Sequence, residues 1–347
     1  MFYVRPIARE DLSALLSLSE RTGAGLTTLP ANKERLASRI ERSLASFARN
    51  APRAEECYVF VLVDGGSGSV VGISAIEAAV GLAEPWYNYH VGTQVHASRE
   101  LGVYTAAPTL FLTNDHTGHS ELCSLFLDAH HRRAKNGPLI SKARLLFIAE
   151  FSDRFGAKVI AELRGKLDAN GRSAFWEGLG RHFFAMEYSR ADYLTGIGRK
   201  AFVAELMPRY PVYAQLLPEE ARAVIGQVHA DSQPARALLE SEGFSYEGYV
   251  DIFDAGPTLE CARDNIRAVR QSEIFPVRIG TEESAEHDPA QDEIAWLVSS
   301  RSFERFRCTL AAAPARLADF PLLPHAARTL GVREGDSVRA VPLSPRH

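Results

Sequence analysis

The first part of the chain alternates short apolar runs with stripes of apolar residues at helical spacing. Residues 2–7 form an apolar run that predicts a strand. Two helices follow, the first expected to end at Thr22 and Gly23 and the second to begin after the N-cap residue Asn32. Their apolar stripes comprise Leu12, Leu15, Leu16 and Leu18 in the first helix, and Leu36, Ile40, Leu44 and Phe47 in the second.

Two runs rich in β-branched and aromatic residues come next. Residues 58–63 and 70–76 flank a glycine-rich turn at 64–68, which predicts an antiparallel hairpin. A further apolar run at 158–163 predicts another strand. The order of strand, two helices, antiparallel strands and then strand, turn and helix is typical of an α/β (α+β) protein with a mixed central sheet.

A strand, a basic turn and a long helix follow one another between residues 121 and 151. The strand covers residues 122–127, and the helix is predicted to begin at Pro138. The turn between them carries three cations, Arg132, Arg133 and Lys135, and ends at Gly137. Backbone donors of a helix N-terminus and cationic side chains meet here, which suits a phosphate or pyrophosphate group. A basic loop in an ordinary α/β domain is the alternative, because neither a P-loop nor a dinucleotide fingerprint is present.

The remainder of the chain predicts a partial internal repeat and a C-terminal appendage. A helix, a glycine and aromatic residues recur at 173–184 and 231–244, and each unit is expected to lead into a strand. Residues 280–292 are acidic and polar, as in a linker or exposed loop. The segment 331–341 predicts a hairpin in a small C-terminal β appendage.

Composition narrows the class of protein. With 347 residues and 46% hydrophobic residues, the chain is long enough for two domains, or for one domain with large insertions. A formal net charge of −4 and the lack of a basic run argue against a nucleic-acid partner. Four scattered cysteines without a Cys-x-x-Cys pair, no signal peptide and no membrane-spanning apolar run predict a reduced, soluble, cytoplasmic protein.

The basic turn resembles the Arg-x-x-Gly-x-Gly turn with which GNAT-type acyltransferases hold the pyrophosphate of coenzyme A. Here Arg132 and Gly137 match the ends of that pattern, and Lys135 replaces the middle glycine. Longer motifs resemble one family in particular, the arginine N-succinyltransferases, over roughly residues 1–270. They are residues 25–30, 84–89, 121–127, 175–176, 204–208, 225–229 and 248–257.

The resemblance implies a GNAT-like fold with succinyl-CoA and L-arginine as substrates, N2-succinylarginine as the product, and no permanently bound cofactor. The family's acid/base histidine lies in a Gly-x-Val-His motif, which falls on His229, and a succinyl-CoA contact falls on Leu125. Residues 1–200 would form the acyl-CoA-binding domain, 201–280 a second GNAT-like half with the histidine, and 281–347 the linker and C-terminal subdomain. The family also implies a homo-oligomer or a heteromer with a related subunit, in the degradation of arginine.

Acyl transfer from a thioester to an amine needs proton transfer and an oxyanion donor, but no covalent enzyme intermediate. Histidine suits the proton transfer because its ordinary pKa, about 6.5, is near the operating pH. A backbone N–H at Leu125 is the candidate oxyanion donor. Two alternatives are a non-catalytic, partner-dependent subunit and an acetyltransferase on the same fold.

Other polar and aromatic residues offer less specific signals. His116 and His119, with Asp115 and Glu121, raise the possibility of a zinc site, but they lack a helical i, i+4 pair, so we expect a polar loop that lines the cleft and no metal. The carboxylates of this loop, Asp251 and Asp254 are rival partners for a guanidinium. Trp86, Tyr87 and Tyr89 either stack on substrate or form an aromatic cluster of the core or an interface.

Overall fold

The predicted hairpin lies at the centre of a long mixed sheet. In the computed structural model, which describes residues 1–21, 29–133, 135–197, 201–280 and 293–345, it consists of β2 (Cys57–Asp64) and β3 (Val70–Glu77). Successive side chains of β2 enter two different cores, because strand residues alternate between the faces of a sheet. Tyr58 and Phe60 pack on one face, and Val59 and Val61 pack on the other.

The strands of the described residues form one sheet, in which most neighbours are antiparallel and β6–β7 and β11–β14 are parallel. In spatial order they are β14 (Phe320–Leu322), β11 (Glu273–Ile279), β15 (Ser337–Pro342), β12 (Glu293–Ser300), β13 (Cys308–Pro314), β1 (Phe2–Pro6), β2, β3, β6 (Ser120–Leu127), β7 (Lys158–Glu162), β10 (Pro257–Ala262), β9 (Ser245–Val250), β4 (Asn88–Ser98), β5 (Val103–Thr113) and β8 (Val212–Tyr213). The expected α/β architecture with a mixed central sheet is confirmed.

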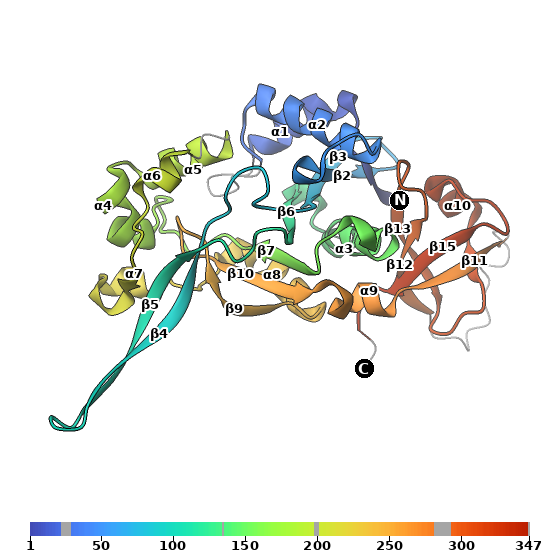
Figure 1. The fold of residues 1–347 in the computed structure, drawn as a ribbon. Coiled ribbons are helices and arrows are strands. Elements are labelled where there is room, and N and C mark those ends of the chain that lie inside the picture. The colour runs from blue at the N-terminus through green and yellow to red at the C-terminus, as the bar shows by residue number, and fades with distance from the viewer. Residues whose placement is uncertain (22–28, 134, 198–200, 281–292, 346–347) are drawn as a thin grey trace.

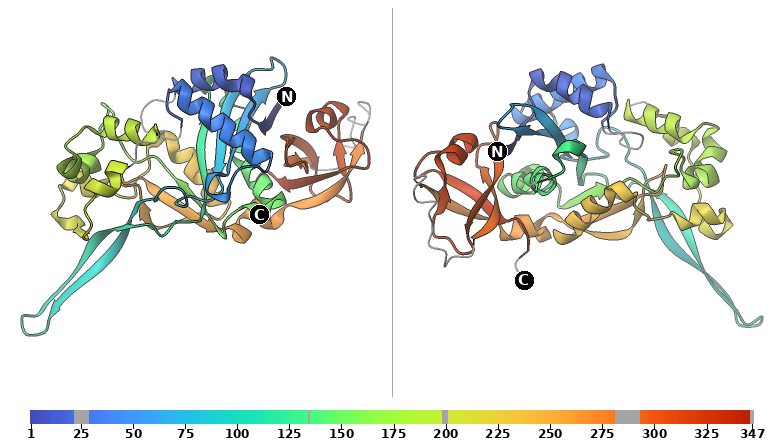
Figure 2. Two further views of the ribbon diagram at one scale, coloured as in Figure 1. Left: turned by 45° about the horizontal axis from the view of Figure 1, so that its top comes forward. Right: turned by 180° about the vertical axis from the view of Figure 1, so that it is seen from behind.

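Helices cover both faces of the central strands. The amphipathic helices α1 (Leu12–Ser19) and α2 (Lys33–Phe47) pack on one face, and α3 (Asn136–Glu150) packs on the other (Figures 1 and 2). Asn32 is the N-cap of α2, as predicted, and its side chain accepts a hydrogen bond of 2.9 Å from the backbone N–H of Arg35. Most residues of α3 are buried, because the C-terminal strands close over its outer side.

The shorter helices lie on either side of this centre. Four of them pack around a separate apolar core that includes Trp176, beside the base of β4 and β5 (Figure 1). These are α4 (Arg181–Phe184), α5 (Tyr188–Gly196), α6 (Ala201–Leu206) and α7 (Glu219–Ala223). The others are α8 (Gln233–Ser241), α9 (Arg267–Gln271) and α10 (Pro324–Leu330).

Strands β4 and β5 form a hairpin arm that the sequence analysis did not predict. Their register runs from Asn88 opposite Thr113 to Ser98 opposite Val103, and the outer half extends away from the body in all views (Figures 1 and 2). Leu101 and Tyr104 at its tip are 75% and 73% exposed. Exposed apolar side chains gathered at one place are typical of a contact surface.

Two local predictions are wrong. The segment 331–341 is not a hairpin: Gly331 is the C-cap of α10, and β15 is a single strand between β11 and β12. The first repeat unit does not lead into a strand either, because Phe183 and Phe184 lie in helix α4, whereas the second unit leads into β9 as predicted. The C-terminal β part joins the main sheet where β13 pairs with β1.

Some predictions concern residues outside the described ranges. The expected end of the first helix and most of the loop at 25–30 lie there, as does nearly all of the acidic segment 280–292. The division at residues 200 and 280 remains a prediction.

Candidate active site

The parallel strands β6 and β7 separate after two rungs. Ser120 pairs with Val159 and Glu121 pairs with Ile160, and from there the strands diverge around a cavity of about 1370 Å³. Backbone and side chains of both strands line this cavity, together with residues of α2, α3 and α5. Divergent parallel strands provide an elongated slot between two rows of peptide groups, so the opening suits a long, thin ligand.

A β-bulge lies on the β6 side of this opening. Phe126 pairs with Ile73 and Cys123 pairs with Ala75, so two residues of β6, Ser124 and Leu125, oppose one residue of β3. Ser124 has a φ of 52°, a left-handed conformation that is uncommon outside glycine. A bulge takes peptide groups out of the regular ladder and redirects them. The predicted donor Leu125 is therefore in the irregular part of the strand, and it lines the cavity.

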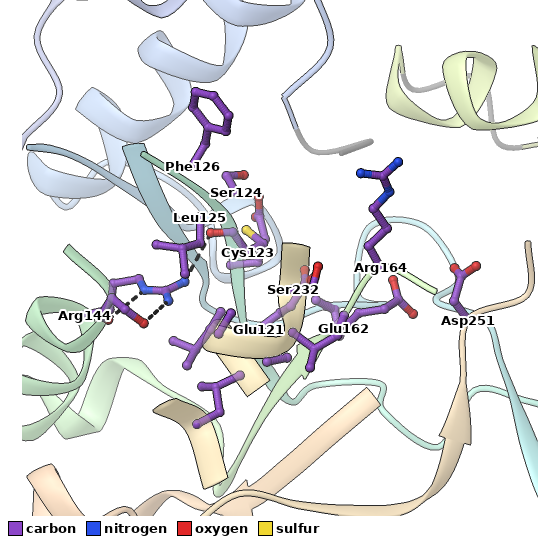
Figure 3. A pocket seen from close by; sticks show the side chains of 18 of the residues that line it. Glu121, Cys123, Ser124, Leu125, Phe126, Arg144, Glu162, Arg164, Ser232 and Asp251 are labelled. Atoms are coloured by element: carbon purple, nitrogen blue, oxygen red, sulfur yellow. Dashed lines mark hydrogen bonds between the residues drawn. The ribbon is translucent and has the colours of Figure 1, made fainter. Parts of the chain in front are cut away.

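Arg144 of α3 stabilises the bulge by hydrogen bonds to the backbone of β3 and β6. Its guanidinium donates hydrogen bonds to the carbonyl oxygens of Ala75 (3.3 Å) and Cys123 (3.2 Å), as well as to the carbonyl and hydroxyl oxygens of Ser141 (both 3.1 Å) (Figure 3). The side chain is 2% exposed and lines the cavity. Burial lowers the pKa of Arg144 to about 10. No local sequence pattern identifies this residue, because an arginine inside a helix is most often on its surface.

The basic turn forms part of the cavity wall at the N-terminus of α3. Arg132, Arg133, Lys135 and Gly137 all line the cavity, and the three cations are exposed. Lys135 has a φ of 64°, so it adopts the left-handed conformation for which the family pattern uses glycine. Arg132 also donates a hydrogen bond of 3.1 Å to the carbonyl of Leu127, which ties the turn to the end of β6. The structure therefore brings the five predicted cofactor-binding residues to one cavity.

His229 lies beside the cavity and is not one of its lining residues, although Asp231 and Ser232 are. Its backbone N–H donates to the carbonyl of Arg164 at 2.8 Å. Its Nδ1 accepts a hydrogen bond of 3.1 Å from the backbone N–H of Asp231. This contact assigns the proton of the neutral imidazole to Nε2. In the neutral side chain Nε2 is thus a hydrogen-bond donor.

Three carboxyl groups line the cavity on the side of β7: Asp254 is buried, and Glu162 and Asp251 are half-buried. Burial raises the pKa of Glu162, of Asp251 and of Asp254, and the negative charge of Asp251 raises that of Glu162 further. Asp254 has a structural role, because it accepts hydrogen bonds of 2.8 Å from the backbone N–H groups of both Gly165 and Gly256. Glu162 was missed by the sequence analysis, since a glutamate at the end of an apolar run has no distinguishing pattern.

The polar loop at residues 113–121, which was expected to line the cleft, has mainly a structural role. His116 is buried, and its ring nitrogens lie 2.8 Å from the Asn88 side-chain oxygen and 3.1 Å from a Glu260 carboxylate oxygen. Of residues 113–121, Glu121 lines the cavity and the others do not, so the prediction that this loop lines the cleft is wrong for them. Within the described ranges, no group of three or more histidine, cysteine, aspartate and glutamate residues could hold a metal ion.

The three aromatic residues lie in two places, Tyr87 also packs against the core, and stacking on substrate remains a prediction. Trp86 and Tyr87 line the cavity, and Tyr89 is buried in the core.

Divergent parallel strands, a bulge beside the opening and a basic helix N-terminus define a CoA-dependent acyltransferase with a GNAT-like fold. A family model described as "Arginine N-succinyltransferase beta subunit" matches residues 2–268, and the C-terminal domain model of the same family matches residues 278–342. The chain belongs to the arginine N-succinyltransferase family.

Individual relatives match over nearly their whole length. The chain is 53% identical to the arginine N-succinyltransferase of Yersinia pseudotuberculosis (99% of this chain, 98% of the relative). It is 55% identical to the arginine N-succinyltransferase subunit beta of Pseudomonas aeruginosa (98% of each). The solved structure of arginine/ornithine succinyltransferase subunit AI from Pseudomonas aeruginosa superimposes with a TM-score of 0.89 at 37% identity, over 99% of both chains.

Proposed function

We propose that this chain transfers the succinyl group of succinyl-CoA to the α-amine of L-arginine, giving N2-succinylarginine and CoA in arginine catabolism. The observation that carries the proposal is a single cavity whose mouth is cationic, at the basic turn, and whose β7 side is acidic. An anionic CoA thioester and a cationic amino acid match these two ends. The names of the relatives agree with this pair of substrates.

Succinyl-CoA would enter along the divergent strands. Arg132, Arg133 and Lys135 would bind its phosphates, and the N-terminus of α3 at Gly137 would supply backbone donors and a favourable dipole. The pantetheine would then extend between β6 and β7 to the bulge. No helix among the described residues has the length and apolarity to cross a bilayer. The four free cysteines, all buried, support our placement of the protein in the reducing cytoplasm.

The reaction forms a C–N bond and breaks the C–S bond of the thioester. The α-ammonium loses a proton before attack, and the leaving thiolate gains one. The backbone N–H of Leu125, in the bulge, would stabilise the oxyanion, a contribution of roughly 3 kcal/mol. His229 would take up the proton that the amine loses and, as the imidazolium, return a proton to the leaving thiolate. In the neutral ring the contact with Asp231 leaves the proton on Nε2, which can donate a hydrogen bond to the sulfur.

The test is release of free thiol by the purified chain with succinyl-CoA and candidate acceptors. We expect release that depends on L-arginine, and weak release with acetyl-CoA. Equal rates with acetyl-CoA would favour the acetyltransferase alternative. L-Ornithine in the same assay ranks the two acceptors. No release by a chain that binds succinyl-CoA would favour the partner-dependent subunit.

We also propose that the chain assembles into a multimer, with the exposed tip of the hairpin arm as the contact to a second copy. Leu101 and Tyr104 support this proposal by their exposure, and two of the similar proteins are described as subunits. Light scattering measures the oligomeric state of the wild-type chain and of a Leu101→Ser/Tyr104→Ser variant, and we expect a multimer for the first and a smaller species for the second. A monomeric wild-type chain would refute it, and so would a variant that remains fully multimeric.

A further inference from the structure

Arg164 is a cation of the cavity that has no ion-pair partner among the described residues. It lies two residues after the end of β7 and lines the cavity, into which Figure 3 shows its guanidinium projecting. Within the described part of the chain its side chain makes no ion pair and no hydrogen bond, and its Nε is buried without a partner. The side chain is half-buried, and a buried guanidinium nitrogen without a hydrogen-bond acceptor points to an anionic group of a ligand.

Two carboxyl groups lie on the same side of the cavity. Glu162 and Asp251 are beside Arg164, across from Leu125 and Arg144 (Figure 3). Glu162 accepts a hydrogen bond of 3.0 Å from the Asn88 amide, and Asp251 accepts from two backbone N–H groups. Neither carboxyl pairs with a cationic side chain in the described ranges. Burial raises the pKa of both; the charge of Asp251 raises that of Glu162 further, and the charge of Asp254 raises that of Asp251 further. A cationic ligand would relieve this repulsion.

Tyr188 of α5 lies beside these carboxyls. Its side chain is only 3% exposed and lines the cavity. Burial raises the pKa of its hydroxyl, and the nearby charges of Asp254 and Asp251 raise it further. Tyr188 thus adds an aromatic ring and a polar group to this side of the cavity.

Glu162, Arg164, Tyr188 and Asp251 together are called the acceptor wall below. An unpaired guanidinium beside two unpaired carboxyls matches a zwitterion, since a guanidinium binds a carboxylate through two parallel hydrogen bonds. The ladder between β6 and β7 ends at Glu121 and Ile160, so Glu162 is two residues beyond the last rung. The acceptor wall is therefore next to the opening that would hold the thioester.

We propose that Arg164 binds the α-carboxylate of the acceptor amino acid, and that Glu162 and Asp251 bind its cationic groups. The assignment rests on the proposed function for the identity of the acceptor as L-arginine. It makes Arg164 the residue that selects an amino acid over a simple amine. Agmatine, which has the amine and the guanidinium of arginine but lacks the carboxylate, is the matching probe.

The experiment is calorimetric titration of the full chain, with CoA present, by L-arginine and by agmatine. The wild type should bind L-arginine about 10- to 100-fold more tightly than agmatine. Arg164→Met should weaken L-arginine to the level of agmatine and leave agmatine within about threefold, because only the carboxylate contact is lost. Arg164→Lys, which keeps the charge without the planar fork, should lie between.

Two further variants sharpen the comparison. Glu162→Gln should weaken both ligands, because both carry the cationic groups. Arg305→Met, at an exposed arginine outside the cavity lining, should change neither. An Arg164→Met protein that still prefers L-arginine, or that loses both ligands equally, would overturn the assignment. If that variant does not fold, the L-arginine-to-agmatine ratio of Arg164→Lys decides, and an unchanged ratio overturns the assignment.

Failure of the proposed function gives a different result. A wild-type chain that binds L-arginine through Arg164 but releases no thiol from succinyl-CoA refutes the function and leaves the acceptor wall intact. A chain that turns over L-arginine while Arg164→Met keeps its preference refutes only the acceptor wall. Absence of any L-arginine binding by the wild type refutes both.

Discussion

The guanidinium of Arg144 donates a hydrogen bond of 3.2 Å to the carbonyl oxygen of Cys123, directly before the bulge in β6. The same side chain bonds to the carbonyl of Ala75 on β3. The bulge interrupts the ladder between these strands, and Arg144 supplies the donors for carbonyls at that point. A buried cation in α3 thus determines the backbone geometry on the donor side of the cavity.

Replacing Arg144 with methionine should therefore affect both stability and turnover. Two buried carbonyls would lose charged donors, so we expect the free energy of unfolding to fall by roughly 2–5 kcal/mol. The kcat should fall more than the KM for succinyl-CoA rises, because the bulge is beside the reacting carbonyl and the phosphate contacts are elsewhere. Urea denaturation and steady-state kinetics measure the two effects. A large loss of stability with normal kcat in the folded fraction would limit Arg144 to a structural role.

Removing the His229 imidazole should reduce turnover without unfolding the protein. We expect His229→Ala to lower kcat by ~10²–10⁴-fold, the usual contribution of acid–base catalysis. Its melting temperature should remain close to that of the wild type, since the side chain makes one local hydrogen bond to Asp231. His182→Ala, at an exposed histidine, is the control. Near-normal kcat for His229→Ala would refute the proposed role.

Two substitutions of Lys135 separate the effect of its backbone conformation on stability from the effect of its charge on succinyl-CoA binding. Its left-handed φ of 64° favours glycine, so Lys135→Gly should be more stable than Lys135→Ala by about 1 kcal/mol. Both variants lose the cation, so both should raise the KM for succinyl-CoA, and the rise should shrink at high salt. Thermal denaturation and kinetics at two salt concentrations measure this. Equal stability of the two variants would contradict the conformational argument.

The ion pairs of Glu260 should make stability depend on acidic pH. The hydrogen bond with His116, together with Lys158, lowers the pKa of Glu260 to about 2. A lowered folded-state pKa stabilises the fold above the unfolded pKa, about 4.3, and this contribution is lost as the pH falls towards 2. Denaturation at pH 7, 4 and 3 should show a steeper decline for the wild type than for Glu260→Gln. Parallel declines would contradict the prediction.

Glu162 should make the stability of the fold depend on pH in the opposite direction. Burial raises its folded-state pKa, so the ionised form is disfavoured in the fold and stability is lost as the pH rises above the ordinary value of about 4.3. Glu162→Gln should therefore be more stable than the wild type at pH 8, with a smaller difference at pH 5. The same variant should bind L-arginine more weakly, which is the usual cost of a functional charge. A variant less stable than the wild type at pH 8 would contradict this account.

Local patterns determined a large part of the fold. The apolar runs of the hairpin at residues 58–63 and 70–76, the cap at Asn32 and the strand–turn–helix order after residue 121 all appear in the structure as predicted. Each depends on neighbours within a few positions, where periodicity and capping act directly. The basic turn was found for the same reason, because its residues are consecutive.

Only the tertiary structure decided which charged groups meet on the β7 side of the cavity and which residue stabilises the bulge in β6. Glu162 and Asp251 are 89 positions apart in the chain, and Arg144 meets Ala75 across 69 positions. Contacts of this length depend on which strands become neighbours, and no local pattern records that choice. The hairpin arm was missed because its outer half packs on nothing and so lacks the apolar alternation by which a half-buried strand is recognised. The sequence determined most of the elements and the family. Packing determined which carboxyls came together and which arginine has no ion-pair partner among the described residues.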